Sequence, residues 1–171
     1  MPPVATTSDV DLVEMARQGD RFAFERLLAR HDEQMRALAF RLLADADAMD
    51  DALQVAYLHA FTGLPKHKPG GDFSQYLYRA TYNACVDEIR RRKGVPHPAP
   101  SPDQVWTTAE VVRQALAELP PAQRITVVLV DGEGFEVDAV AGILGVPADT
   151  VSSRLYRART RLRRVLWDEV R

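Results

Sequence analysis

The chain of 171 residues is long enough for one ordinary domain or two small ones, and its 46% content of hydrophobic residues is sufficient for a packed core. Charged residues make up 27%, which argues against a wholly disordered chain, and the net charge of -2 does not by itself mark a nucleic-acid binder. The single cysteine, Cys85, cannot form an internal disulfide and shows no ligand spacing with the four histidines, so neither a metal nor a cofactor is expected.

The beginning of the chain carries no recognisable targeting segment. Residues 1–9 lack the basic region and apolar core of a signal peptide, and they are expected to form a flexible tail. No run of about eighteen apolar residues is present, so no insertion into a membrane is expected. The sequence therefore predicts a soluble, cytoplasmic protein.

Apolar residues recur at steps of three and four through the first half of the chain, which predicts helices. Ser8 or Asp9 can cap the first helix, and Asp20 can cap the second. A turn around Asp45 precedes the third helix, and Ser74 is suited to cap the fourth. The expected helices cover about 10–19, 21–43, 48–63 and 75–93.

Acidic side chains gather near the start of the third helix, where Asp50 and Asp51 lie close to Gln54. The helix dipole favours negative charge at this end, so a purely structural role is one interpretation. The other is a partner surface, because the block Arg90–Lys93 and the last helix are basic. Separate patches of opposite sign indicate two kinds of partner.

A row of aromatic and polar residues follows one side of the fourth helix, opposite its apolar face. Tyr76, Arg79, Asn83, Asp87 and Arg90 are spaced by three or four residues and follow a loop that contains glycines. Rings that stack on bases, beside cations that track the backbone, suit single-stranded nucleic acid. The alternative is that the tyrosines pack on neighbouring helices.

Residues 94–106 are expected to form an interdomain linker. Four prolines fall within 94–103, and such a segment cannot continue a helix and should be extended and semi-rigid. The sequence therefore predicts an all-α protein of two small helical domains, over residues 10–93 and 107–171, joined by a proline-rich linker.

The second half again shows helical patterns. Thr107 or Thr108 can cap a helix that ends before Pro120, and the next helix begins at Pro121. The β-branched residues 125–128 could also form a strand, although the proline start favours a helix. A short helix over about 136–144, a turn at 145–147 and a basic helix from about 148 complete the chain.

The last helix carries a polar, basic stripe beside its buried one, and no acidic residue occurs from Thr150 to Trp167. With the short helix and glycine turn before it, this helix has the dimensions of a helix-turn-helix. Hydroxyl groups can reach base edges or phosphates, and arginines can neutralise phosphates. The alternative is a solvated basic face. The residues that would face DNA are Thr150, Ser153, Arg154, Arg157 and Arg161.

Both halves resemble the extracytoplasmic-function (ECF) group of bacterial RNA polymerase sigma factors, in the order and with the linker typical of that family. The segments similar to region 4 are 119–124, 131–135, 143–147 and 150–159. In the first half, 50–54 resembles region 2.2, and 71–79 with Asn83, Asp87 and 90–91 resembles regions 2.3 and 2.4. Val55 and Tyr76 stand where the family usually has Glu and Trp.

The resemblance implies a subunit that binds core RNA polymerase, recognises promoter DNA and helps to open it. Asp50, Asp51 and Gln54 would dock on the clamp helices of the beta-prime subunit, whereas region 4 would sit on the beta flap and read the double-stranded minus-thirty-five element. One base of the single-stranded minus-ten element would be flipped into a loop pocket. The residues assigned to the minus-ten element are Lys66, Phe73, Tyr76, Arg79, Asn83, Asp87, Arg90 and Arg91.

Two other classes of protein are alternatives to this interpretation. A stand-alone helix-turn-helix regulator would need neither the aromatic helix with Asn83 nor the acidic surface at Asp50 and Asp51. An enzyme is not expected, because the sequence shows no phosphate-binding loop, metal spacing or nucleophile with its base. Members of the family are usually held inactive by an anti-sigma factor that covers both domains, which makes such a protein an expected partner. The linker would let the halves spread along polymerase or fold together around the inhibitor.

Overall fold

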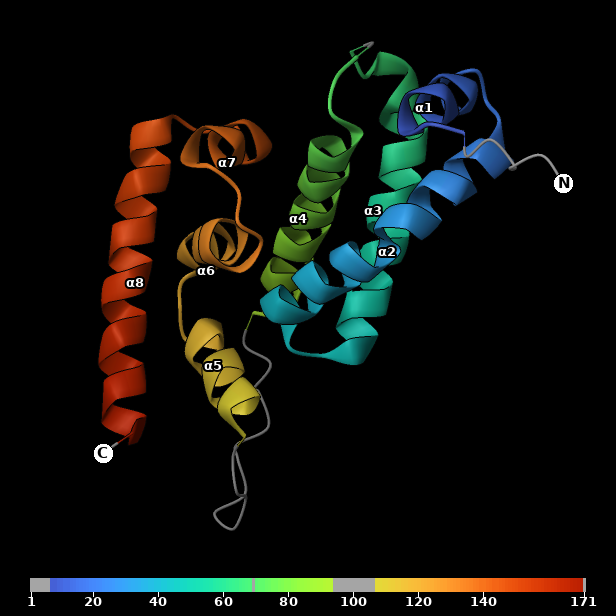
Figure 1. The fold of residues 1–171 in the computed structure, drawn as a ribbon. Coiled ribbons are helices and arrows are strands. Elements are labelled where there is room, and N and C mark those ends of the chain that lie inside the picture. The colour runs from blue at the N-terminus through green and yellow to red at the C-terminus, as the bar shows by residue number, and fades with distance from the viewer. Residues whose placement is uncertain (1–6, 69, 94–106, 171) are drawn as a thin grey trace, which may run out of the picture.

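The computed structural model describes residues 7–68, 70–93 and 107–170, and the regular structure of these residues is entirely helical (Figure 1). The expected linker at 94–106 and most of the expected tail lie outside the described residues. The elements are α1 (Asp9–Arg17), α2 (Arg21–Leu43), α3 (Ala46–Gly63), the 3-10 turn η1 (Leu64–Lys66), α4 (Phe73–Arg91), α5 (Thr108–Ala117), α6 (Pro121–Val127), the π-helical turn η2 (Val128–Gly132), α7 (Val137–Leu144) and α8 (Ala148–Val170).

Most helix starts agree with the side chains expected to cap them. The side chains of Ser8, Asp20 and Asp45 accept hydrogen bonds from backbone N–H groups of the first turns of α1, α2 and α3. The expected cap of α4 was wrong. Asp72 accepts from the Gln75 backbone N–H at 3.3 Å, so α4 begins before Ser74.

The β-branched segment of the second half is helical, and the strand alternative is not realised. Ile125, Val127 and Val128 are buried on α6 and at its end. The helix then widens into η2, where the Glu133 backbone N–H donates to the Val128 carbonyl at 2.9 Å, five residues back. This turn ends the helix and places Glu133 against the first half.

The helices form two groups that pack against each other. In Figure 1, α8 runs along the edge farthest from α1, and α5, α6 and α7 lie between it and α4. The two groups share one core, in which fully buried Leu38 and Leu77 of the first half and Ile125 of the second belong to the same cluster. The halves are therefore in direct contact and form a closed arrangement.

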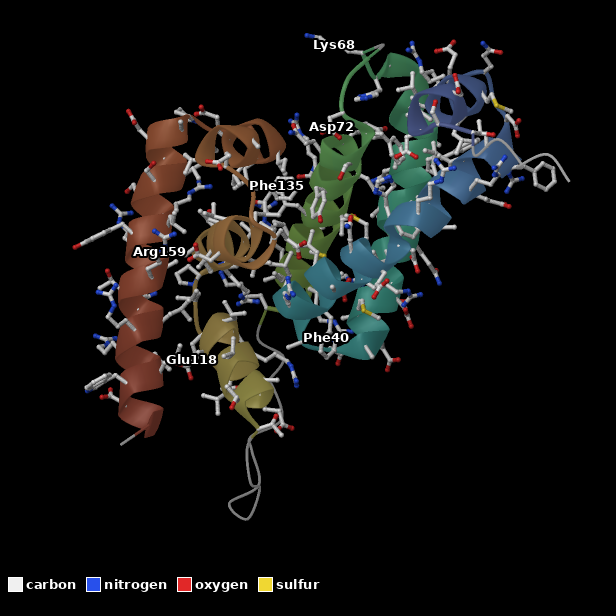
Figure 2. All side chains as sticks on the ribbon, viewed as in Figure 1. Phe40, Lys68, Asp72, Glu118, Phe135 and Arg159 are labelled. Carbon is white, nitrogen blue, oxygen red and sulfur yellow. The ribbon has the colours of Figure 1, made fainter. Side chains whose placement is uncertain are left out.

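Specific side-chain contacts join the groups. The rings of Tyr78 and Phe135 meet edge to face with centroids 4.9 Å apart, and Figure 2 shows Phe135 between α7 and α4. The guanidinium carbon of Arg113 lies 5.3 Å from the centroid of the Phe40 ring, within reach of a cation–π attraction. These contacts connect α5 with α2 and the segment before α7 with α4.

Candidate nucleic-acid and polymerase interfaces

The turn between α7 and α8 sets the geometry of a helix-turn-helix. Gly145 ends α7 with φ at 66°, a left-handed conformation that glycine adopts without a steric penalty, and its N–H donates to the Ala141 carbonyl at 2.9 Å. The Pro147 carbonyl accepts from the backbone N–H groups of Thr150 and Val151 at the start of α8. The buried Val151 then packs the new helix onto α7.

The polar stripe of α8 faces away from this packed side. Ser153, Arg157 and Arg161 are exposed, and Thr150 and Arg154 are half-buried at its margin. Among the residues that the structure describes, none forms an ion pair with these three arginines. Their charge is thus available for phosphates or base edges.

Two further polar residues of α8, Arg159 and Tyr156, lie outside the predicted set of DNA-facing residues. Arg159 donates from Nε and Nη2 to the carboxylate of Asp131 at 2.9 and 2.6 Å, so its charge is used inside the second half. Tyr156 is 74% exposed, and sequence reasoning left it out of the predicted set. It lies three residues beyond Ser153 and is therefore its neighbour on the helix surface, a position that helical spacing could have identified.

The minus-ten residues predicted on α4 divide into two groups. Arg79, Asn83, Asp87 and Arg90 are exposed and succeed one another at steps of three or four, so they form one outward row. Phe73 is only 5% exposed. Arg91 is exposed, as is Lys66 at the end of η1.

Phe73 and Tyr76 pack inside the first half, in agreement with the packing alternative for the tyrosine. The Tyr76 ring lies with its centroid 4.6 Å from that of His67 and 6.1 Å from that of Phe73. Its hydroxyl donates to the Ala60 carbonyl at 2.7 Å, and burial raises the pKa of this phenol. A Cβ atom on Gly63 would lie 2.9 Å from the hydroxyl, so glycine leaves room for the bond. In this conformation the Phe73 ring is buried and the Tyr76 ring is half-buried.

The basic block at the end of α4 is partly neutralised by the protein itself. The carboxylate of Glu88, 5% exposed, accepts hydrogen bonds from Arg91 and from Nε of Arg92, the latter at 2.6 Å. Arg92 also lies 3.5 Å from Asp45, and the hydrogen bond to Glu88 is the main cause that raises its pKa. The block therefore offers less charge to phosphates than its composition indicates.

The three residues predicted to bind polymerase do not share one environment. Asp50 accepts from Nη1 of Arg36 on α2 at 3.0 Å. Asp51 and Gln54 instead line a hollow of about 380 Å³ between α3 and α4. Val55, Asp87 and Arg91 line the same hollow, together with Ala52, Ala84 and Glu88. The fold thus brings part of the polymerase set next to part of the minus-ten set.

Comparison with known proteins gives the family. Residues 27–95 match the family described as sigma-70 region 2, and residues 109–162 match sigma-70 region 4. The ECF RNA polymerase sigma factor SigM of Mycobacterium tuberculosis (strain ATCC 25618 / H37Rv) is 38% identical over 168 residues, which cover 93% of this chain and 85% of that protein. The chain belongs to the ECF sigma factors.

Solved sigma-factor structures share the fold of this ECF sigma factor. CnrH, in complex with the cytosolic domain of CnrY, has a TM-score of 0.73 at 25% identity and covers 92% of this chain and 96% of its own. RpoE of Bartonella quintana, solved with the anti-sigma factor NepR, has a TM-score of 0.69 at 25% identity and covers 84% and 96%. The predicted two-domain helical fold and promoter-recognising function are confirmed, and a stand-alone regulator is not favoured because region 2 is present.

Two further observations concern membrane-spanning helices and the single cysteine. No helix among the described residues is long and apolar enough to cross a membrane. Cys85 is buried, and desolvation raises the pKa of its thiol to about 12, so it is an unreactive packing residue at neutral pH.

Proposed function

We propose that residues 107–171 read the minus-thirty-five element and that residues 10–93 bind core polymerase and the opened minus-ten element, with 94–106 as the linker. The observation that carries the proposal is the stripe of α8, which combines two short hydroxyl side chains with three arginines that no described residue pairs. Arginine is the usual partner of guanine O6 and N7 in the major groove. Arg154 and Arg157 are therefore assigned to base edges, Thr150 and Ser153 to bases or phosphates, and Arg161 to phosphates.

The outward row of α4 is assigned to the minus-ten element. Arg79 and Arg90 would follow the backbone of the single strand, and the amide of Asn83 would hydrogen-bond to an unpaired base. Asp87 and Arg91 lie at the end of this row, beside the hollow that Asp51 also lines. Phe73 and Tyr76 are assigned an indirect role, because their packing holds the loop that precedes α4.

A hollow beside that loop is the candidate pocket for the flipped base. It measures about 580 Å³ and lies between α1 and the loop, with Gly71, Asp72 and Phe73 on one side. Asp9 and Asp11 are among the residues of α1 that line it. Carboxylates accept hydrogen bonds from amino groups, so the pocket would favour a base with an exocyclic amine. Lys66, just before the loop, would contact a neighbouring phosphate.

The surface around Asp51 and Gln54 is assigned to the clamp helices of the beta-prime subunit, with Asp50 at its edge. Val55 and Leu58 of α3 are 44% and 61% exposed and would add apolar contacts there. Binding energy would drive the opening of the promoter, with no covalent step. The protein would act in the cytoplasm, where the polymerase is. An anti-sigma factor is expected to regulate the protein by covering these surfaces, and region 4 would rest on the beta flap.

Run-off transcription with bacterial core RNA polymerase and a randomised promoter library tests the proposal. Transcripts are expected to begin at a fixed distance from two enriched sequence elements, and core polymerase alone serves as the control. Replacing Arg154 should relax the upstream element, whereas Arg163→Ala, which removes the same charge outside the stripe, should not. A chain that binds duplex DNA but never directs initiation would overturn the proposal.

A further inference from the structure

One carboxylate of the second half holds two helices of the first. The side chain of Glu133 is 15% exposed, and its Oε1 accepts from Nη1 of Arg41 on α2 at 2.6 Å. Its Oε2 accepts from the hydroxyl of Tyr78 on α4 at 3.2 Å. Ionic hydrogen bonds of this kind are the strong ones, particularly away from water.

The contacts around Glu133 shield it from solvent. Tyr78 is 2% exposed because the ring of Phe135 covers it edge to face. Burial and the neighbouring carboxylate raise the pKa of the Tyr78 phenol, so it keeps its proton and remains a donor. Arg124 of the second half also joins the two halves. Its guanidinium donates to the backbone carbonyl of Leu42 at the end of α2 and to that of Ala117 in α5, the latter at 2.8 Å.

The second half lies against the helix assigned to the minus-ten element. Tyr78 is the immediate neighbour of Arg79 in that helix. The turn of the helix-turn-helix is also close, because a Cβ atom on Gly145 would lie 3.5 Å from Nη2 of Arg79. The cation at the head of the outward row of α4 is therefore beside region 4 in the closed arrangement.

The closed arrangement is too small to contact both promoter elements. Their names place them about 25 positions apart, which is about 85 Å of duplex at roughly 3.4 Å per base pair. A compact chain of this length has a radius of gyration of about 16 Å. The two halves must consequently separate before both elements are bound at once.

We propose that Glu133 is the centre of a latch, formed with Arg41 and Tyr78, that closes the free sigma factor and keeps region 4 against α4 until promoter recognition opens it. The proposal rests on the proposed role of α4 in minus-ten recognition. The latch is intramolecular, so the chain limits its own ability to contact both promoter elements at once before any inhibitor binds.

Charge reversal at the latch provides the test on the full chain. Glu133→Arg places two like charges together and should open the molecule, Arg41→Glu should do the same, and the double exchange should close it again. Small-angle X-ray scattering is expected to give a larger radius of gyration for each single variant and the wild-type value for the double variant. Asp131→Arg is the matched control, because Asp131 is two residues away but pairs with Arg159 inside the second half.

A second measurement links closure to DNA. Simultaneous contact with both elements needs the open form, and the apparent affinity for both together falls by the fraction of open molecules. If a tenth or less of the protein is open, Glu133→Arg should bind a promoter fragment that carries both elements about tenfold more tightly or better. A single-stranded minus-ten oligonucleotide should be bound about equally by the variant and the wild type, because the outward row of α4 is already exposed in the closed form. The double exchange should reverse the gain. Single variants that stay compact, or that open without a gain in affinity, would overturn the latch. An open variant that binds no minus-ten DNA at all would overturn the proposed role of α4 instead.

Discussion

Helices α8 and α4 contain 23 and 19 residues and carry the two proposed DNA-reading rows, yet they present their polar residues differently. The helix α8 lies at the edge of the molecule, packs through one side, and leaves Ser153, Arg157 and Arg161 of its stripe exposed. The helix α4 is packed against α3, α2 and α7, so its aromatic rings and part of its basic end serve the fold. A central helix has to divide its surface between core, neighbouring domain and ligand, and residue type alone does not reveal that division.

The largest expected effect concerns the buried ring of α4. Phe73→Ala should lower the free energy of unfolding by about 3–5 kcal/mol, because it removes a packed ring and leaves a cavity. Urea denaturation measures the loss. Phe22→Ala is the matched control, since the Phe22 ring is 79% exposed and its removal should cost little. Equal losses in the two variants would contradict the assignment of Phe73 to the core.

The stripe of α8 should respond in recognition rather than in stability. Arg154→Ala and Arg157→Ala should each weaken binding to the minus-thirty-five element by about 1–3 kcal/mol if they contact bases. Binding of holoenzyme to promoter fragments with and without the element measures the effect. Arg163→Ala on the same helix should weaken all sequences slightly and equally, and the assignment fails if the three variants behave alike.

Variants of Tyr76 and Asn83 distinguish a residue of α4 that supports the fold from one that is proposed to contact DNA. Tyr76→Phe removes only the hydroxyl that bonds to Ala60, so it should cost about 1 kcal/mol of stability and leave promoter opening intact. Asn83→Ala should spare stability and closed-complex binding but impair opening. Permanganate reactivity of promoter thymines reports on opening. A loss of reactivity in Tyr76→Phe at normal stability would show that the phenol acts on DNA.

The smallest effect is a pH dependence at the start of α3, where Asp45 is the capping residue. The backbone N–H of Ala48 and, less strongly, Arg92 lower the pKa of Asp45 below its ordinary value of 3.8. A depressed acid contributes stability that is present above that value and is lost as the pH falls through the folded pKa. Asp45→Asn keeps a capping side chain and should therefore flatten the loss of stability below about pH 4. Urea denaturation at a series of pH values measures the loss, and equal profiles for the wild type and Asp45→Asn would contradict the prediction.

The features that the sequence predicted well are those set by neighbours in the chain. Asp20 caps α2, and Val151 lies on the buried side of α8, because spacing and capping chemistry act within one or two turns. The stripe from Thr150 to Arg161 follows from the same periodicity. Family resemblance supplied the order of the two domains and the roles assigned to them.

The features that the sequence missed depend on distant partners. The bond between Tyr76 and Ala60 spans 16 residues, and the ion pair between Arg41 and Glu133 spans 92. The spacing of residues along one helix does not reveal contacts between residues so far apart in the sequence. The burial of Glu88 beneath Arg91 was equally hidden, because a helix with alternating charges has the same pattern whether its acid is solvated or enclosed. The ion pair between Asp50 and Arg36 of the preceding helix was hidden for the same reason.

The π-helical turn η2 makes the position of Glu133 dependent on chain length. An α-helix advances about 100° per residue, so deletion of one residue from η2 would let the helix continue regularly and would rotate Glu133 by roughly that angle away from Arg41. The residues of α8 and α4 that form the two proposed DNA-reading rows would not be changed by the deletion. Insertions and deletions usually damage a helical protein. Here we expect a single deletion to convert the closed, self-restrained form into a permanently open one.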